Sequence, residues 1–137
     1  MKQSAKIYSF DFDGTIVQNK YPEIGEPISE VIQFIQRAKA DGNYIILNTM
    51  REGKHLNQAV DFCRDNGIVF DAVNDNLPHM QAYFKNNPRK IFANYYIDDH
   101  NLFMPEINSI TSEDYEELGG SFGGTTEQRD VQQKMII

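Results

Sequence analysis

The sequence predicts an α/β fold: a doubly wound, Rossmann-like parallel sheet covered by helices on both faces, with no cap domain. Short apolar runs suited to buried strands alternate with segments of helical periodicity along most of the chain. The strands are separated by helix-length crossovers, which parallel pairing requires. With 137 residues, of which 40% are hydrophobic, the chain is long enough to bury one apolar core without disulfides.

The first strand and the first helix are separated by a polar loop. Residues 6–11 are predicted to form a strand, and the turn signal Asp13-Gly14 ends it. A polar stretch containing two prolines follows and is interpreted as a loop. A helix is then predicted over about 28–40 because apolar residues recur there at helical spacing. These residues are Val31, Phe34, Ile35 and Ala38.

Three further strands and two helices complete the predicted sheet. The run 44–47 suits a fully buried parallel strand, and a helix follows Gly53. The remaining elements are a strand over 68–73, a short helix over 78–84 and a strand over 95–97. We expect residues 1–110 to form the core domain. Residues 111–137, which break the pattern, are expected to form an extension that is partly flexible or docks on a partner.

Composition excludes several classes of function. The net charge of −7 disfavours nucleic acid and anionic membranes as partners, although a bound cation can reverse the field at a local site. Cys63 is the only cysteine, so there is no intramolecular disulfide and no thiolate metal cluster. No run approaches the ~20 apolar residues of a membrane span, and the first residues lack a signal peptide. We therefore expect a soluble, cytoplasmic protein.

Polar side chains follow three of the predicted strands. Asp11 and Asp13 flank the end of the first, Thr49 follows the second along the chain, and Asp98-Asp99 follows the last. In open parallel sheets the ligand crevice lies outside the carboxyl ends of the strands, so these groups are expected to meet there. Adjacent acids after a buried strand repel one another unless a cation relieves them, and Mg²⁺ prefers carboxylates, phosphate and water as ligands.

Each of these motifs has a simpler structural interpretation when it is taken alone. Asp-Gly turns after strands are common, and a threonine at a strand end often binds local backbone. Lys90, which precedes the last strand, could be a solvated lysine, and Asp98-Asp99 an acidic loop. The combination of all of them in one order is much more specific than any single motif.

Together the motifs resemble the four signatures of the haloacid dehalogenase superfamily, over roughly residues 6–104. Asp11-Phe12-Asp13-Gly14-Thr15 matches the first, Thr49 the second, Lys90 the third and Asp98-Asp99 the fourth. The resemblance implies a phosphatase in which Asp11 is the nucleophile and forms an aspartyl-phosphate, while Asp13 is the general acid/base. An acid at Asp13 favours phosphate chemistry, because the dehalogenases of the family lack an acid at that position.

The resemblance also implies a cofactor and phosphate ligands. Mg²⁺ would be held by the Asp11 carboxylate, the Asp13 backbone carbonyl and Asp99, with Asp98 as a direct or water-mediated ligand. Thr49 and Lys90 would bind and neutralise the phosphoryl oxygens, together with the backbone N–H groups of Phe12 and Met50. Beside the expected site, Arg51 and His100 are candidate contacts for the leaving group, or else ordinary loop residues.

The segments in which larger members carry a cap are too short here to hold a separate core. The site is therefore expected to be open, covered by a large phosphorylated substrate, by the flexible tail, or by a neighbouring subunit in a homo-oligomer. The identity of the substrate is not readable from the sequence.

Several other functions compete with a phosphatase. In the receiver domains of response regulators the paired acids follow the first strand. Here the paired acids Asp98-Asp99 follow the last predicted strand, so a receiver domain is disfavoured. A member of the family that binds a phosphorylated ligand without turnover is harder to exclude. No sequence feature suggests it, because no catalytic position of the four motifs is missing. A phosphotransferase or mutase generally needs a cap to exclude water, and a phosphatase of nucleic-acid ends is disfavoured by the acidic charge.

Overall fold

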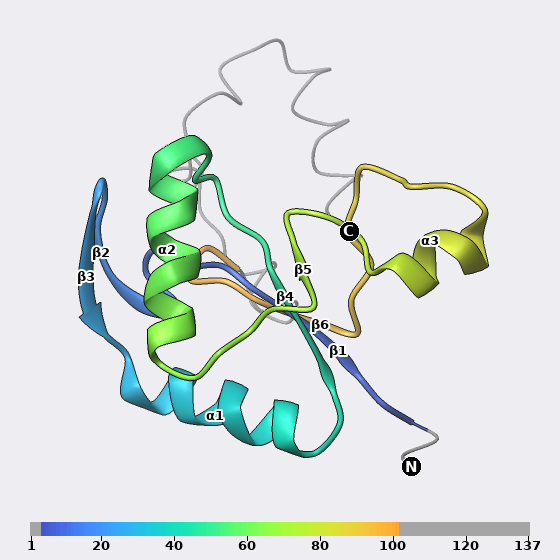
Figure 1. Ribbon diagram of the computed structural model, residues 1–137, viewed down its shortest axis with the longest axis horizontal. Helices are drawn as coiled ribbons and strands as arrows, with labels where there is room; N and C mark the ends of the chain where they lie inside the picture. Colours follow the sequence, from blue (N-terminus) through green and yellow to red (C-terminus); the bar gives the residue numbers. More distant parts are fainter. Residues whose placement is uncertain (1–3, 102–137) are drawn as a thin grey trace, which may run out of the picture. The chain divides into compact units, whose positions relative to one another are not determined.

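The computed structural model describes residues 4–101 (Figure 1). Strands and helices alternate along most of this part of the chain. In order, the elements are β1 (Ile7–Phe10), β2 (Val17–Lys20), β3 (Glu23–Pro27), α1 (Ser29–Ala40), β4 (Tyr44–Leu47), α2 (Gly53–Asp65), β5 (Ala72–Val73), α3 (Pro78–Phe84) and β6 (Tyr95–Ile97).

Four of the strands form one parallel sheet in the order β5-β4-β1-β6. β1 lies in the centre, where Phe10 is in register with Leu47 of β4 on one side and with Ile97 of β6 on the other. The prediction of an α/β fold with a parallel sheet is confirmed. Since all four strands run in one direction, the segments that follow β1, β4 and β6 emerge at one edge of the sheet.

The apolar side chains of the sheet divide between two core clusters, as the alternation of side chains in a strand requires. Ile45 and Leu47 of β4 belong to the cluster that contains buried residues of α1 and α2, among them Ile35 and Cys63. Ile46 points the other way and packs in the cluster of Leu77, against which Met80 of α3 is packed. Burial raises the pKa of the Cys63 thiol to about 12, so this side chain is an uncharged packing residue.

The largest departure from the predicted fold is the segment between β1 and α1. It was expected to be a loop, but it forms the antiparallel hairpin of β2 and β3, whose turn holds the cis peptide bond Tyr21-Pro22. In α1 the buried face contains Ile32 rather than Phe34, which is partly exposed and contacts Tyr8 edge-on.

The third predicted strand is also much shorter than expected, since only β5 (Ala72–Val73) pairs with β4. The Asp71 carboxylate accepts a hydrogen bond from the N–H of Ile45 at 2.8 Å, in the place where a longer strand would offer a backbone carbonyl. A second carboxylate oxygen of Asp71 accepts one from Lys39 of α1 at 3.0 Å. A side chain therefore ends the ladder at this point.

Between residues 4 and 101, no helix has the length and apolar character needed to cross a bilayer. The predicted domain boundary at 110 and the extension 111–137 lie outside the described residues.

Candidate functional site

Three carboxylates come together at the edge of the sheet where β1 and β6 end. Asp11 directly follows β1, and its N–H donates to the carbonyl of Ile97 at 2.9 Å. One carboxylate oxygen from each of Asp11, Asp98 and Asp99 lies within 4.8 Å of the others. Such a set of oxygen donors suits a hard divalent cation such as Mg²⁺. The structure thus brings together the three acids that the sequence predicted as metal ligands.

The turn after β1 holds Asp99 in place. The buried hydroxyl oxygen of Thr15 accepts a hydrogen bond from the N–H of Asp99 at 3.1 Å. Gly14 has a φ of +85°, and a Cβ built on it would lie 2.7 Å from the Cγ of Asp99. The Asp99 carboxylate therefore occupies the space that only a glycine leaves open. Thr15 was recognised in the sequence as part of a motif, but its contact with Asp99 was not.

Replacing Gly14 with alanine is expected to weaken Mg²⁺ binding strongly, because the new methyl group must displace Asp99. The matched control is Gly42→Ala: Gly42 has a similar φ of +87°, but a Cβ there meets nothing within 4 Å. Both variants should lose about 1 kcal/mol of stability through backbone strain. Isothermal titration with Mg²⁺ separates them, and equal Mg²⁺ affinities in the two variants would contradict the packing of Asp99 against Gly14.

The clustering of acids shifts the ionisation of Asp11. Its pKa is raised from 3.8 to about 6, mainly because the carboxyl is partly buried and also because Asp98 and Asp99 are close to it. The N–H of Phe12 donates to the Asp11 carboxylate and acts in the opposite direction. Ionised Asp11 is thus unfavourable in this environment unless positive charge is supplied, which is the behaviour expected of a cation ligand.

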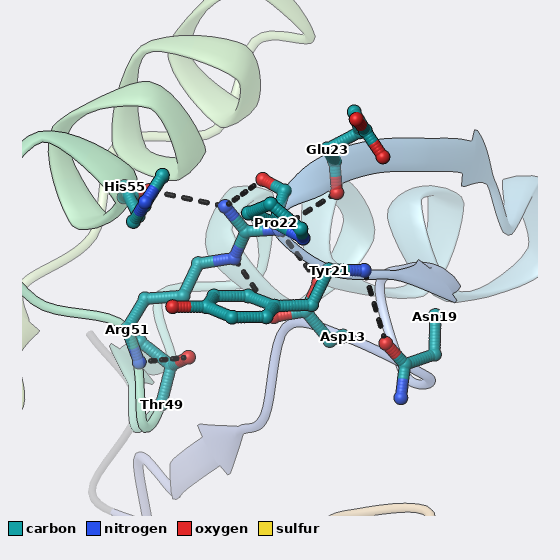
Figure 2. Close-up of polar contacts among 8 residues, drawn as sticks. All are labelled: Asp13, Asn19, Tyr21, Pro22, Glu23, Thr49, Arg51 and His55. Atoms are coloured by element: carbon teal, nitrogen blue, oxygen red, sulfur yellow. Dashed lines mark hydrogen bonds and ion pairs between the residues drawn. The ribbon is translucent and has the colours of Figure 1, made fainter.

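Asp13 lies in a bidentate ion pair with Arg51 (Figure 2). Nε of Arg51 donates to Asp13 Oδ2 and Nη2 donates to Oδ1, both at 2.8 Å. The Arg51 side chain is 1% exposed, whereas that of Asp13 is 15% exposed. The guanidinium is therefore buried in the protein, whereas the carboxylate keeps limited access to solvent.

The other donors of Arg51 are used by backbone carbonyls. Nη1 donates to the carbonyls of Pro22 at 3.2 Å and His55 at 3.3 Å, and Nη2 donates to that of Glu23 at 2.9 Å. The hydrogen bonds to Asp13 raise the pKa of Arg51 above its ordinary value. With all five guanidinium N–H groups engaged, Arg51 has no donor left for a substrate. This geometry disfavours a contact between Arg51 and the leaving group, and that role stays a prediction.

The loop after β4 places Thr49 beside Arg51. The Thr49 hydroxyl oxygen accepts a hydrogen bond from the N–H of Arg51 at 3.1 Å, and its own N–H donates to Asn74 Oδ1 at 2.7 Å. Accepting a bond leaves the hydroxyl proton available for donation to a phosphoryl oxygen. Asn74, at the end of β5, was not recognised from the sequence. Met50, which lies between Thr49 and Arg51 in the sequence, is 97% exposed, so this part of the loop is open to solvent.

Lys90 and His100 are placed less directly. The ammonium of Lys90 lies 5.7 Å from the centroid of the Tyr96 ring, on an exposed side chain. Its role as a phosphate ligand stays a prediction. His100 is exposed and follows Asp99 in the chain, and its role as a substrate contact also stays a prediction.

Comparison with known proteins supports the fold and leaves the activity open. No protein-family model matches the chain. No curated protein matches it either. The chain is similar to a solved structure of a conserved protein coded by a locus in Bacteroides thetaiotaomicron, with 29% identity and a TM-score of 0.64. The match covers 92% of this chain and 98% of that one. The description of that protein names no activity, so the likeness bears on the α/β fold.

Proposed function

We propose that this chain is a Mg²⁺-dependent phosphohydrolase of the haloacid dehalogenase type, acting on phosphate monoesters. The observation that carries the proposal is the meeting of Asp11 with Asp98 and Asp99, whose oxygens lie within 4.8 Å of one another. This arrangement combines a nucleophile at a strand end with a site for the cation that a phosphate dianion requires. The four motifs in order supply the rest of the argument.

The chemistry assigned to the carboxylates is the one that the resemblance to the haloacid dehalogenase superfamily implies. Asp11 attacks phosphorus, and the bond between phosphorus and the leaving oxygen breaks while the aspartyl-phosphate forms. Asp13 gives its proton to that oxygen and then accepts one from the water that attacks phosphorus, which releases phosphate and restores Asp11. A Mg²⁺ ion held by Asp11, Asp99, the Asp13 carbonyl and, directly or through water, Asp98 would neutralise phosphoryl charge.

The remaining residues bind the phosphoryl oxygens. The donors assigned to the charge that spreads over these oxygens in the transition state are the Thr49 hydroxyl, the Phe12 and Met50 N–H groups and the Lys90 ammonium. The N–H of Phe12 would have to exchange its hydrogen bond to the Asp11 carboxylate for one to a phosphoryl oxygen. The hydroxyl of Thr49 accepts a hydrogen bond from the N–H of Arg51, so its own proton is not used in that contact. This supports its role as a donor to phosphate.

We further propose that the protein is a doubly wound, Rossmann-like core without a cap. Packing of α1 and α2 in one core cluster and of α3 against the other supports the double winding. The segment after the first motif is occupied by the β2–β3 hairpin, which holds no core of its own. An open site favours hydrolysis over phosphoryl transfer, because water reaches the phosphoenzyme.

Hydrolysis of an aryl phosphate, measured with and without metal, tests the proposal. We expect turnover in Mg²⁺, loss of turnover in excess EDTA and its return when Mg²⁺ is restored. Turnover that is indifferent to chelation would remove the metal role of the three acids and with it the proposed reaction class.

Mg²⁺ binding is expected to weaken as the pH falls through about 6, the raised pKa of Asp11. Because this pKa lies above the unfolded value, ionised Asp11 lowers the stability of the metal-free protein at pH 7, and protonation between about 6 and 3.8 relieves the cost. Mg²⁺ competes with that proton, so its affinity at pH 5 should be about tenfold lower than at pH 7. Calorimetric titration checks this, and an equal affinity at both pH values would contradict it.

A second candidate, a protein that binds a phosphorylated ligand without turnover, is favoured by one observation. Both carboxylate oxygens of Asp13 already accept hydrogen bonds from Arg51, and this contact competes with proton transfer at the same oxygens. Beryllofluoride, which mimics a phosphoryl group on aspartate, should bind in either case. Binding combined with no hydrolysis of any phosphate ester would favour the second candidate.

A further inference from the structure

We infer that Arg51 is a positioning residue for the proposed reaction: it sets the direction of the Asp13 carboxylate without touching substrate. This inference rests on the proposed function, because Asp13 matters for turnover only if it transfers the proton. The central observation is the pair of 2.8 Å hydrogen bonds from Nε and Nη2 of Arg51 to the two oxygens of Asp13. A bidentate contact fixes a carboxylate plane as well as its place, which a single hydrogen bond does not.

The guanidinium is itself held on several sides. The carbonyls of Pro22 and Glu23 come from the turn and first residue of the β2–β3 hairpin, and that of His55 comes from the first turn of α2. Its Cζ atom also lies 5.0 Å from the ring centroid of Phe12 and 5.1 Å from that of Tyr21. Figure 2 shows the Tyr21 ring beside the guanidinium and the carbonyl groups converging on it.

This arrangement makes the direction of Asp13 a property of three separate segments. Each carboxylate oxygen can accept two hydrogen bonds, so the contact with Arg51 leaves one lone pair on each oxygen for a proton in transfer. The 15% exposure of the Asp13 side chain leaves room for a substrate or water to approach it. Lysine at position 51 would keep the charge but could not reproduce the fork.

A double-mutant cycle on the Asp11-dependent hydrolysis of an aryl phosphate tests this role. The four proteins are wild type, Arg51→Lys, Asp13→Asn and the double variant, each first shown to be folded by circular dichroism. In the wild-type background we expect Arg51→Lys to lower kcat about 100-fold, with KM unchanged, because the acid/base is misplaced. Asp13→Asn should lower kcat by about 10²–10⁴-fold. In the Asp13→Asn background, Arg51→Lys should lower kcat further by less than about a factor of two.

Two results of the cycle would overturn the inference while leaving the phosphatase intact. One is a wild-type kcat in Arg51→Lys, which would show that charge alone is needed. The other is a multiplicative loss in the double variant, which would show that Arg51 does not act through Asp13. If wild type hydrolyses no ester, or does so equally well after Asp11→Asn, the proposed function fails and this inference falls with it.

A gentler variant covers the case in which Arg51→Lys does not fold. Tyr21→Leu removes the exposed ring beside the guanidinium and leaves every hydrogen bond of Arg51 in place. It should lower kcat severalfold in the presence of Asp13 and have no effect in Asp13→Asn. Tyr83→Leu, at an exposed tyrosine of α3, is the matched control and should leave kcat unchanged. Equal behaviour of the two tyrosine variants would count against the positioning role.

Discussion

Asp11→Asn is expected to abolish phosphate hydrolysis while the protein stays folded. The substitution keeps the volume of the side chain but replaces the attacking carboxylate with an amide, which cannot form the aspartyl-phosphate. It also removes a carboxyl whose pKa is raised to about 6 by burial and by Asp98 and Asp99, so the metal-free variant should be slightly more stable than wild type at pH 7. Steady-state kinetics and thermal melts in EDTA measure the two effects.

Asp41→Asn is the matched control for Asp11→Asn. Asp41 is an exposed acid at the end of α1, and it precedes β4 instead of following a strand, so it lies at the opposite edge of the sheet. Its replacement should change neither hydrolysis nor Mg²⁺ binding. If Asp11→Asn hydrolysed the substrate at the wild-type rate, the nucleophile would have to be another residue.

Breaking the Asp13–Arg51 pair is expected to have the largest effect on stability. Arg51→Met leaves the Asp13 carboxylate, which is 15% exposed, without its partner and deprives three backbone carbonyls of their donor. Removing one member of a buried ion pair costs about 3–5 kcal/mol. Since domains are stable by only about 5–15 kcal/mol, a large share of the total is lost. Urea unfolding in EDTA measures the change.

The control for this prediction is Arg64→Met. Arg64 forms an ion pair of similar length, 3.0 Å to Asp61, but its side chain is 62% exposed. Exposed pairs contribute about 0–1 kcal/mol, so this variant should remain close to wild type. If both methionine variants lost the same small amount of stability, the contact between Asp13 and Arg51 would not contribute as a buried ion pair does.

Much of the sheet was predictable because its signals are local. The run 44–47 and the helix after Gly53 coincide with β4 and α2, and the short helix predicted over 78–84 is α3. These segments have strong apolar periodicity or clear end signals, and tertiary contacts only reinforce them. The strand predicted over 68–73 was overestimated because apolar content alone does not show that Asp71 replaces the backbone partner of Ile45.

The β2–β3 hairpin was missed for a physical reason. Three of the four residues of β2 are exposed, and β3 contains Gly25 and ends at Pro27, so neither strand shows the alternation of a half-buried strand. The hairpin is held by its pairing and by the contacts of Val17 and Ile24 with the main core, which come from elsewhere in the chain. The loop interpretation holds for Pro22, which lies in the turn, but it is wrong for Gly25, which lies within β3.

The cluster of three acids could be predicted from the sequence, whereas the surroundings of Asp13 could not. Asp11, Asp98 and Asp99 each follow a strand, and parallel strands end at one edge, so topology alone brings them together. The Asp13–Arg51 pair joins residues 38 positions apart, through an arginine in the loop after β4. An arginine next to a predicted site has the same local sequence whether it faces substrate or is buried behind the site.

Trapping the covalent intermediate on Asp11 is the most direct test of the account. Wild-type protein would be mixed with an aryl phosphate and Mg²⁺, quenched during turnover, reduced with borohydride and analysed by peptide mass spectrometry. An acyl phosphate on Asp11 predicts conversion of that aspartate to homoserine at position 11. Reduction at another carboxylate, or steady turnover with no modified aspartate at all, would contradict the assignment of Asp11 as the nucleophile.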